Sequence, residues 1–289
     1  MLADVNALAR REIWQAFAPR LHIEDPRSFA DIPFLNSTPE QDRGVAAMLK
    51  HEGYVHAAGV NWGLDIGLMA ETVRALSRAQ LSPVFAYLYD EFWLPYYQMH
   101  RIYSGVLGDY RMLPDFWIWN VDPKAGDSGW KPHRDKGHYA LFPDRSPKSL
   151  TTWIALSAAT PLNGCMYIVP AYFDPTYGTP EDETWKFGFE SARALPAAPG
   201  DVFMWNQAVA HWGSRCSPYA TETRVSMAFE FQRADVEPFN QPLLQPLQPL
   251  SFDMRLALIA KQILQYRHMY KIHPAIELLA EQWAQRLMT

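Results

Sequence analysis

The sequence predicts a mainly β core, an antiparallel sandwich or barrel, with helices before and after it. Apolar residues recur at helical spacing up to about residue 110. At Asp115 the period changes to short aromatic and β-branched runs separated by Pro, Gly, Asn and Asp, and helical spacing returns after residue 250. In a parallel α/β fold, helical and strand-like segments would alternate along the whole chain. Here they occur in separate blocks, so that fold is disfavoured.

Composition favours one globular domain spanning residues 1–289. The hydrophobic share of 48% and the aromatic share of 14% suffice for a large core and an aromatic-lined pocket. The formal net charge is -5, and no run of Lys or Arg creates the positive field that nucleic-acid binding needs. We therefore expect a small-molecule partner and no nucleic acid.

Cysteine usage and apolar runs predict a cytoplasmic protein that makes no membrane contact. Cys165 and Cys216 are too few for a disulfide framework, and residues 1–6 lack the segments of a signal peptide. No apolar run approaches the roughly 20 residues that cross a bilayer.

The N-terminal part, residues 1–114, is predicted to be helical and to pack outside the sheet. Ser82-Pro83 is typical of a helix start, because serine caps and proline is tolerated in a first turn. An earlier helix face is predicted from apolar residues at steps of three and four, namely Ile66, Met69, Val73 and Leu76.

The core, residues 115–236, is predicted to contain at least five strands. The segment 170–199 between them is rich in aromatic residues and prolines, and both a lid and a packed surface excursion are open interpretations. The strands are expected over 116–121, 150–156, 165–169, 202–206 and 224–231.

The last part, residues 237–289, is predicted to be a proline-rich linker followed by two amphipathic helices. The first helix is predicted from Leu256, Ile259, Ile263, Tyr266 and Tyr270. Whether these helices pack on the core or on a second subunit is left open, so a homo-oligomer through the C-terminal helices is one expectation.

A metal site is predicted from two histidines and one carboxylate. Side chains alternate faces along a strand, so His133 and Asp135 can reach the same point. His211, which follows the strand predicted over 202–206, supplies a third ligand. This set matches the facial arrangement by which non-haem Fe(II) oxygenases leave coordination positions open. We expect these three residues to be the metal ligands and the catalytic centre.

Arg224 and Ser226 are predicted to bind a co-substrate. Three protein ligands leave three positions on an octahedral iron, enough for a bidentate co-substrate and O2. If a turn follows His211, the strand beginning at Arg224 runs back beside it. A guanidinium binds a carboxylate through two parallel hydrogen bonds, and Ser226 on the same strand face adds a donor. Fe(II) and a dicarboxylic co-substrate such as 2-oxoglutarate are therefore the expected cofactors.

The order of these motifs resembles the phytanoyl-CoA dioxygenase family of Fe(II)/2-oxoglutarate oxygenases over about residues 115–232. The motifs are Trp130-x-x-His133-x-Asp135, then the segments 151–156, 163–170 and 199–202, then His211, Arg224 and Ser226.

The resemblance implies a double-stranded β-helix, or jelly roll of the cupin-like kind, flanked by helices. It implies that iron is held by the three predicted ligands and that 2-oxoglutarate is held by Arg224 and Ser226, with Asn120 as a further co-substrate residue. The implied reaction is hydroxylation of a small or medium-sized organic metabolite, with release of succinate and CO2. Related halogenases replace the carboxylate ligand with a small residue, so Asp135 favours a hydroxylase over a halogenase.

Two other functions remain open, and so does the substrate. A non-redox metal protein on the same scaffold, either an isomerase or a ligand-binding module, would use the same three ligands, and a pseudoenzyme would use the sheet for assembly. The aromatic residues favour an apolar or ring-containing substrate, whereas Arg134, Lys136 and His138 would suit an anionic group. After Pro170 the sequence departs from the Gly-Ser-His that the family often has, so the resemblance does not extend a substrate role to this loop.

Overall fold

The computed structural model describes residues 5–269 and 272–287; residues 1–4 and Tyr270 of the predicted C-terminal helix lie outside this part. Two antiparallel sheets form the core, one with strand order β1-β6-β3-β8-β2 and one with β5-β4-β7. The strands are β1 (Tyr54–Ala57), β2 (Tyr110–Val121), β3 (Ser149–Ala155), β4 (Met166–Ile168), β5 (Arg193–Leu195), β6 (Val202–Asn206), β7 (His211–Gly213) and β8 (Arg224–Arg233).

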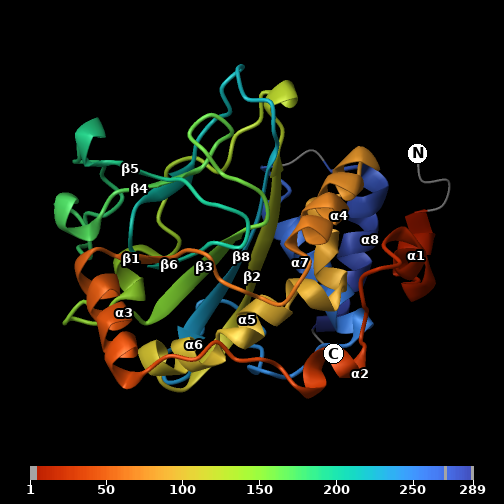
Figure 1. The fold of residues 1–289 in the computed structure, drawn as a ribbon, viewed down its shortest axis with the longest axis horizontal. Coiled ribbons are helices and arrows are strands. Elements are labelled where there is room, and N and C mark those ends of the chain that lie inside the picture. Colours follow the sequence, from red (N-terminus) through yellow and green to blue (C-terminus); the bar gives the residue numbers. More distant parts are fainter. Residues whose placement is uncertain (1–4, 270–271, 288–289) are drawn as a thin grey trace.

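Helices from both ends of the chain cover the outer face of the larger sheet (Figure 1). Helices α4 and α7 contact β2, and α8 packs on α7. The helices are α1 (Arg11–Phe17), α2 (Pro26–Ala30), α3 (Pro39–His51), α4 (Ile66–Arg78), α5 (Leu94–Gln98), α6 (His100–Leu107), α7 (Phe252–Tyr266) and α8 (Pro274–Ala284). The expected combination of helices with antiparallel strands is confirmed.

The larger sheet is buried on both faces, because its strands divide their side chains between two cores. Along β8, Val225, Met227 and Phe229 belong to the core shared with the helices. Ala228 and Trp153 of β3 belong to a second core between the two sheets. The strand alternation thus separates a helix-facing layer from a layer that faces the smaller sheet.

The structure differs from the sequence prediction in the N-terminal part. Residues 54–57 form β1, which pairs with β6 at the edge of the larger sheet. The segment predicted as a helix from Ser82-Pro83 is instead two 3-10 helices, Pro83–Leu88 and Asp90–Phe92. Every residue from Val84 to Leu94 is buried, so contacts on all sides replace the single apolar face of an amphipathic helix.

The C-terminal helix α7 packs on its own chain and supports an irregularity in β2. Its buried residues include Leu256, Ile259 and Ile263. Residues 113–115 interrupt the ladder between β2 and β8, and Gln262 holds the backbone on both sides of Asp115. The Gln262 side chain accepts a hydrogen bond from Phe116 N at 3.2 Å and donates one to the Pro114 carbonyl.

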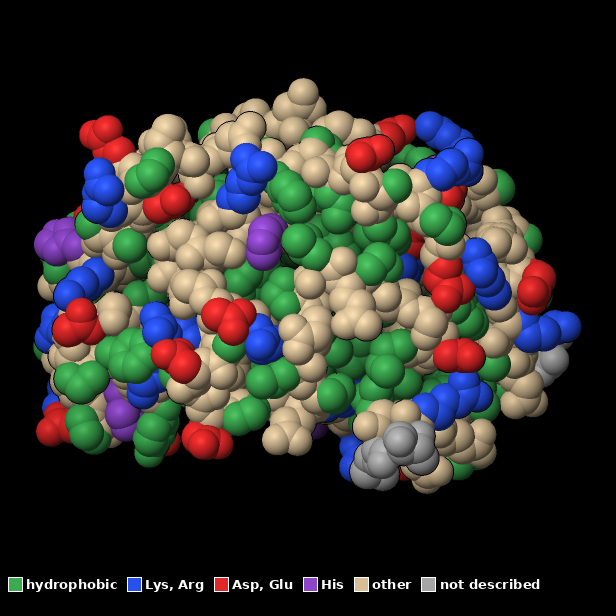
Figure 2. All heavy atoms as spheres, turned by 90° about the horizontal axis from the view of Figure 1, so that it is seen from below, with side chains coloured by type: hydrophobic (Ala, Val, Ile, Leu, Met, Phe, Trp, Pro, Cys, Tyr) green, Lys and Arg blue, Asp and Glu red, His purple; other side chains and the backbone are tan. Residues whose placement is uncertain are grey.

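The described helices and the face drawn in Figure 2 bear on membrane and nucleic-acid partners. Among the described residues, every helix is too short or too polar to cross a bilayer. On the face seen from below, basic and acidic side chains are interspersed (Figure 2). The absence of a nucleic-acid partner and the homo-oligomer through the C-terminal helices both stay predictions.

Replacing Gln262 by alanine is expected to destabilise the fold. The variant would leave the Phe116 N–H and the Pro114 carbonyl buried without this partner, at about 1–3 kcal/mol for each group. We expect a loss of about 2–4 kcal/mol in the free energy of unfolding, measured by urea denaturation. Gln282→Ala on the exposed side of α8 is the control and should change it little. Equal stability of the two variants would contradict the role of Gln262.

Candidate active site

The three predicted metal ligands meet at one point between the two sheets. The backbones of His133 and His211 exchange hydrogen bonds of 3.0 Å in both directions, which sets their side chains on the same face. Asp135 Oδ1 lies 3.4 Å from Nε2 of each histidine. Their ligand atoms all lie within 4.8 Å of one another, a spacing that suits a metal ion.

Both imidazoles are oriented by backbone carbonyls. Nδ1 of His133 lies 2.7 Å from the Lys131 carbonyl, and Nδ1 of His211 lies 3.1 Å from the Val209 carbonyl. A carbonyl only accepts hydrogen bonds, so each Nδ1 carries the proton and Nε2 presents its lone pair when the ring is neutral. This arrangement is typical of metal-ligating histidines.

The Asp135 carboxylate is held by two donors on the oxygen that faces away from the histidines. Oδ2 accepts hydrogen bonds from Thr151 Oγ1 at 2.7 Å and from Trp205 Nε1 at 3.0 Å. Gln207 Nε2 donates to Thr151 Oγ1 at 3.0 Å, so the hydroxyl directs its own proton to the carboxylate. Oδ1 is left as the oxygen that faces the two Nε2 atoms.

The charges of the three ligands depend on one another. Burial alone would raise the pKa of Asp135, but the positive charge of His211 and hydrogen bonds from both histidines hold it well below its usual range. Burial alone would lower the pKa of His133, but its hydrogen bond to Asp135 and the charge of that carboxylate raise it. The carboxylate therefore stays ionised and attracts a positive charge to the site.

Arg224 and Ser226 lie side by side at the start of β8. Both are buried, and Arg224 Nη1 donates to Ser226 Oγ at 2.5 Å. The guanidinium lines the same cavity as the triad. Gly129 and Gly213 pack against it; a Cβ at Gly129 would lie 2.5 Å from the Gly213 Cα and 3.0 Å from Arg224 Nη2. Glycine at these two positions lets the strands approach each other beside the guanidinium.

Asn120 is not brought to this cavity. It pairs with Val225, whose side chain belongs to the helix-facing core, whereas Arg224 and Ser226 point to the opposite face of β8. Asn120 lines a separate hollow beside α4 and residues 122–128. Trp119, which pairs with Ser226, occupies the cavity position instead.

Arg134, Lys136 and His138, the basic residues considered for an anionic substrate, are each paired with an acidic side chain. Arg134 Nη2 lies 2.6 Å from Asp174, Lys136 Nζ 3.1 Å from Glu230, and His138 Nδ1 3.1 Å from Asp182. The Arg134 and His138 pairs anchor the segment 170–199, none of whose residues, all described, lines the cavity. This part of the structure favours a packed excursion over a lid.

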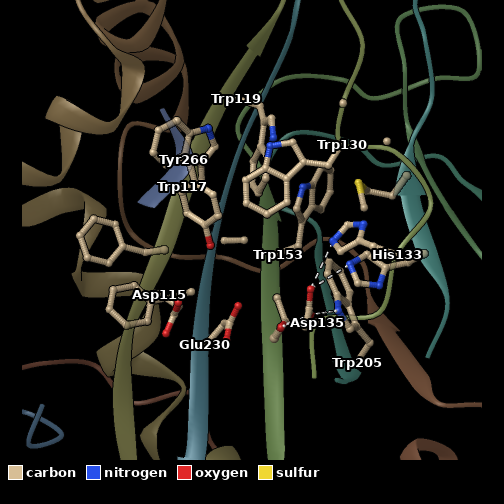
Figure 3. Close-up of a pocket in the computed structure, with 18 of the residues that line it drawn as sticks. Asp115, Trp117, Trp119, Trp130, His133, Asp135, Trp153, Trp205, Glu230 and Tyr266 are labelled. Carbon is tan, nitrogen blue, oxygen red and sulfur yellow. Dashed lines mark hydrogen bonds and ion pairs between the residues drawn. The ribbon is translucent and has the colours of Figure 1, made fainter. Parts of the chain in front are cut away.

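The far side of the cavity contains residues that the sequence analysis missed. Figure 3 shows Asp115 and Glu230 across the cavity from His133 and Asp135. Tyr266 from α7 also lines this side, so the C-terminal helix is a wall of the site. One sequence signal was available, because Pro114 stands just before the strand predicted over 116–121, and proline next to a strand is typical of a bulge or an edge.

A groove outside the cavity gives a route to the triad. It lies between residues 128–136 and the end of α7, and shares Trp130, His133 and Tyr266 with the cavity. The His133 side chain keeps 29% of its surface exposed, against 8% for Asp135 and 4% for His211. A ligand therefore reaches the triad from the His133 side.

Removing the indole donor to Asp135 is expected to weaken metal binding. Trp205→Phe keeps the ring but leaves Thr151 as the donor to Oδ2, and loss of such a supporting contact typically costs about 10–100-fold in metal affinity. The measurement is Mn(II) or Fe(II) titration of the metal-free protein. The matched control, Trp212→Phe on β7, should bind metal like the wild type. Equal affinity in both variants would remove Trp205 from this role.

Metal affinity is expected to fall as the pH is lowered. The raised pKa of His133 means that the metal-free site holds a proton more tightly, and this proton must leave before Nε2 can bind metal. Below that pKa the apparent affinity should drop by up to about tenfold per pH unit for one proton. Calorimetry in buffers of different ionisation enthalpy measures the proton release. An affinity independent of pH would contradict this coupling.

Comparisons with known proteins agree with this geometry. A family model described as phytanoyl-CoA dioxygenase (PhyH) matches residues 97–217, which include the three candidate ligands. "Dioxygenase lolE1" from Epichloe uncinata is 31% identical over 108 residues, which cover 36% of this chain and 40% of that protein. The matched region is thus less than half of that relative.

Solved structures share the fold at low sequence identity. The non-haem monooxygenase ThoJ in its apo form superposes with a TM-score of 0.54 at 15% identity, covering 84% of this chain and 99% of that chain. The α-ketoglutarate-dependent epimerase SnoN from nogalamycin biosynthesis gives 0.52 at 19% identity, covering 74% and 94%. Residues 97–217 thus resemble the phytanoyl-CoA dioxygenase family, and the solved structures share the fold of this chain.

Proposed function

We propose that this protein is an Fe(II)- and 2-oxoglutarate-dependent dioxygenase that hydroxylates a small or medium-sized organic molecule. The observation that carries the proposal is the meeting of His133, Asp135 and His211 at one point of a cavity that also contains the Arg224 guanidinium. Two nitrogens and one carboxylate oxygen suit ferrous iron and leave positions for a co-substrate and O2. The two facing sheets are, in this proposal, a double-stranded β-helix.

The hydrogen-bond donors at the cavity suit a dicarboxylic co-substrate. Arg224 and Ser226 offer a guanidinium and a hydroxyl on one strand face, the donors that a distal carboxylate needs. Trp153 is fully buried and lines the cavity, and among the described residues its Nε1 has no hydrogen-bond partner. A ligand carboxylate or carbonyl would satisfy this donor, since a buried N–H without a partner is costly. Asn120 is not part of the proposed co-substrate site.

When bound, iron and 2-oxoglutarate supply the oxidising power, with succinate and CO2 as the co-products. The chain's own residues hold and orient these groups. Thr151 and Trp205 keep Asp135 turned toward the two histidines, and Arg224 anchors the far end of the keto diacid. Asp135 also occupies the position that a halogenase would leave open for chloride, which favours hydroxylation.

The names of the similar proteins set the range of reactions to consider. They include a dioxygenase, a monooxygenase and an epimerase. Hydroxylation is the outcome we propose within this range. We also keep the cytoplasm as the proposed location, because Cys165 and Cys216 are both free buried thiols.

Arg224→Ala is expected to weaken 2-oxoglutarate binding by about thirtyfold or more. Loss of one partner from a buried charge-assisted contact costs about 2–5 kcal/mol. Binding is measured by the visible charge-transfer band that forms when Fe(II) and 2-oxoglutarate are added without oxygen. Arg233→Ala, at the other end of the same strand, is the control, because its side chain pairs with Asp235 away from the cavity.

The same experiment separates the proposal from its rival, a non-redox isomerase or ligand-binding module. The rival would bind a divalent ion but give no charge-transfer band and no succinate. Wild-type protein that binds iron without forming the band would contradict the proposed function. Unchanged affinity in Arg224→Ala would contradict only the role of Arg224.

A further inference from the structure

The part of the cavity opposite the triad has a polarity that suggests the class of substrate. Strand β8 sends Arg224, Ser226, Ala228 and Glu230 to the cavity face, because alternate residues share a face. The guanidinium is at one end of this row, the small Ala228 side chain leaves space in the middle, and Glu230 is at the other end. Arg224 and Glu230 are about 20 Å apart along the strand at roughly 3.3 Å per residue.

A bulge in β2 brings a second carboxylate beside Glu230. Met112 pairs with Phe231 and Phe116 pairs with Phe229, so residues 113–115 lie opposite Glu230 alone. Pro114 has no N–H for the ladder, and Gln262 of α7 holds the backbone on either side of Asp115. Bulges of this kind redirect side chains next to active sites, and here Asp115 lines the cavity.

Asp115 is buried and held by neutral amides. Its oxygens accept hydrogen bonds of 2.8 and 2.9 Å from Asn240 Nδ2 and one of 2.8 Å from Gln265 Nε2. Lys261 lies behind these amides, where its Nζ donates to Asn240 at 3.0 Å and to Gln265 at 3.2 Å. These two amides bring no charge of their own to Asp115, and Lys261 lies outside the cavity lining.

Among the described residues, Glu230 has one positive partner, Lys136 at 3.1 Å, which lines the outer groove and not the cavity. Burial raises its pKa to about 8 against the opposing charge of Lys136, and the charges of Asp115 and Asp135 raise it further. The single charge of Lys136 cannot balance both neighbouring carboxylates in a desolvated space, so a further positive group is favourable there. A bound cation between Asp115 and Glu230 would relieve this repulsion.

Aromatic rings surround the same space. The Tyr266 ring centroid lies 5.1 Å from that of Trp117 and 4.7 Å from that of Trp130, and all three line the cavity. Aromatic faces attract alkylated ammonium groups and also bury their carbon substituents. Apart from the triad and Arg224, the charged side chains among the described cavity residues are Asp115 and Glu230 (Figure 3).

We propose that the substrate carries a positively charged nitrogen, bound between the carboxylates of Asp115 and Glu230 and the rings of Trp117, Trp130 and Tyr266. The substrate enters along the groove beside the end of α7 and places a C–H bond toward His133 and Asp135. The anionic co-substrate and the cationic substrate occupy opposite ends of one cavity. That this cation is a substrate rests on the proposed function; its binding does not require metal or 2-oxoglutarate.

The test measures binding to the metal-free protein by calorimetry and saturation-transfer NMR. The probes are choline and piperidinium, each compared with an uncharged isostere, dimethylbutanol for choline and tetrahydropyran for piperidinium. At least one cation should bind roughly tenfold or more tightly than its isostere. Asp115→Asn and Glu230→Gln should each reduce that preference, while Asp109→Asn, an exposed carboxylate just before β2, should not.

Addition of Mn(II) then locates the bound cation. The paramagnetic ion at the triad should enhance relaxation of the bound cation's protons more than those of the uncharged isostere. Equal binding of each cation and its isostere, failure of both cations to bind, or binding that both carboxylate variants leave unchanged would overturn the inference. Cation binding without enhancement in protein shown to hold Mn(II) would also overturn it. Protein that binds the cation but retains no metal would refute the proposed function alone.

Discussion

His133 and His211 exchange both of their backbone hydrogen bonds, and the candidate site depends on this pairing. Directly opposed residues in an antiparallel pair send their side chains to one face, so two ligands from segments nearly eighty residues apart become neighbours. Asp135 joins them because it is two residues from His133. Gly129 and Gly213 allow the same pair of segments to stay close next to Arg224.

The larger sheet gives the cavity a basic end and an acidic end. Its central strands are buried on both faces, so hydrophobic residues on one face secure the helices while the other face is free to carry polar groups. On β8 this second face runs from a guanidinium to a carboxylate. The helices do more than cover the sheet, because α7 supports the β2 bulge through Gln262 and supplies Tyr266 as a wall.

Strand and helix periods were sufficient to predict most of the regular elements, but short elements were missed. Strands β5 and β7 have three residues each, too few to display an alternating pattern, although β7 carries His211. Asn120 was predicted in the co-substrate site. It directly follows Trp119 in β2, and neighbouring residues of a strand face opposite sides, so Trp119 faces the cavity and Asn120 faces away from it. Arg134, Lys136 and His138 looked available for an anion because their acidic partners lie 40 or more residues away along the chain.

The sequence by itself determined the kind of chemistry, because residue types and their order identify two imidazoles, a carboxylate and a later arginine. Tertiary structure decided which residues line the side of the cavity opposite the triad. Asp115 reaches Glu230 only through a bulge, and Tyr266 arrives from a helix about 130 residues after His133. The physical reason is that the nature of a ligand atom is local, whereas the charge and shape of a cavity are sums over segments that only folding brings together.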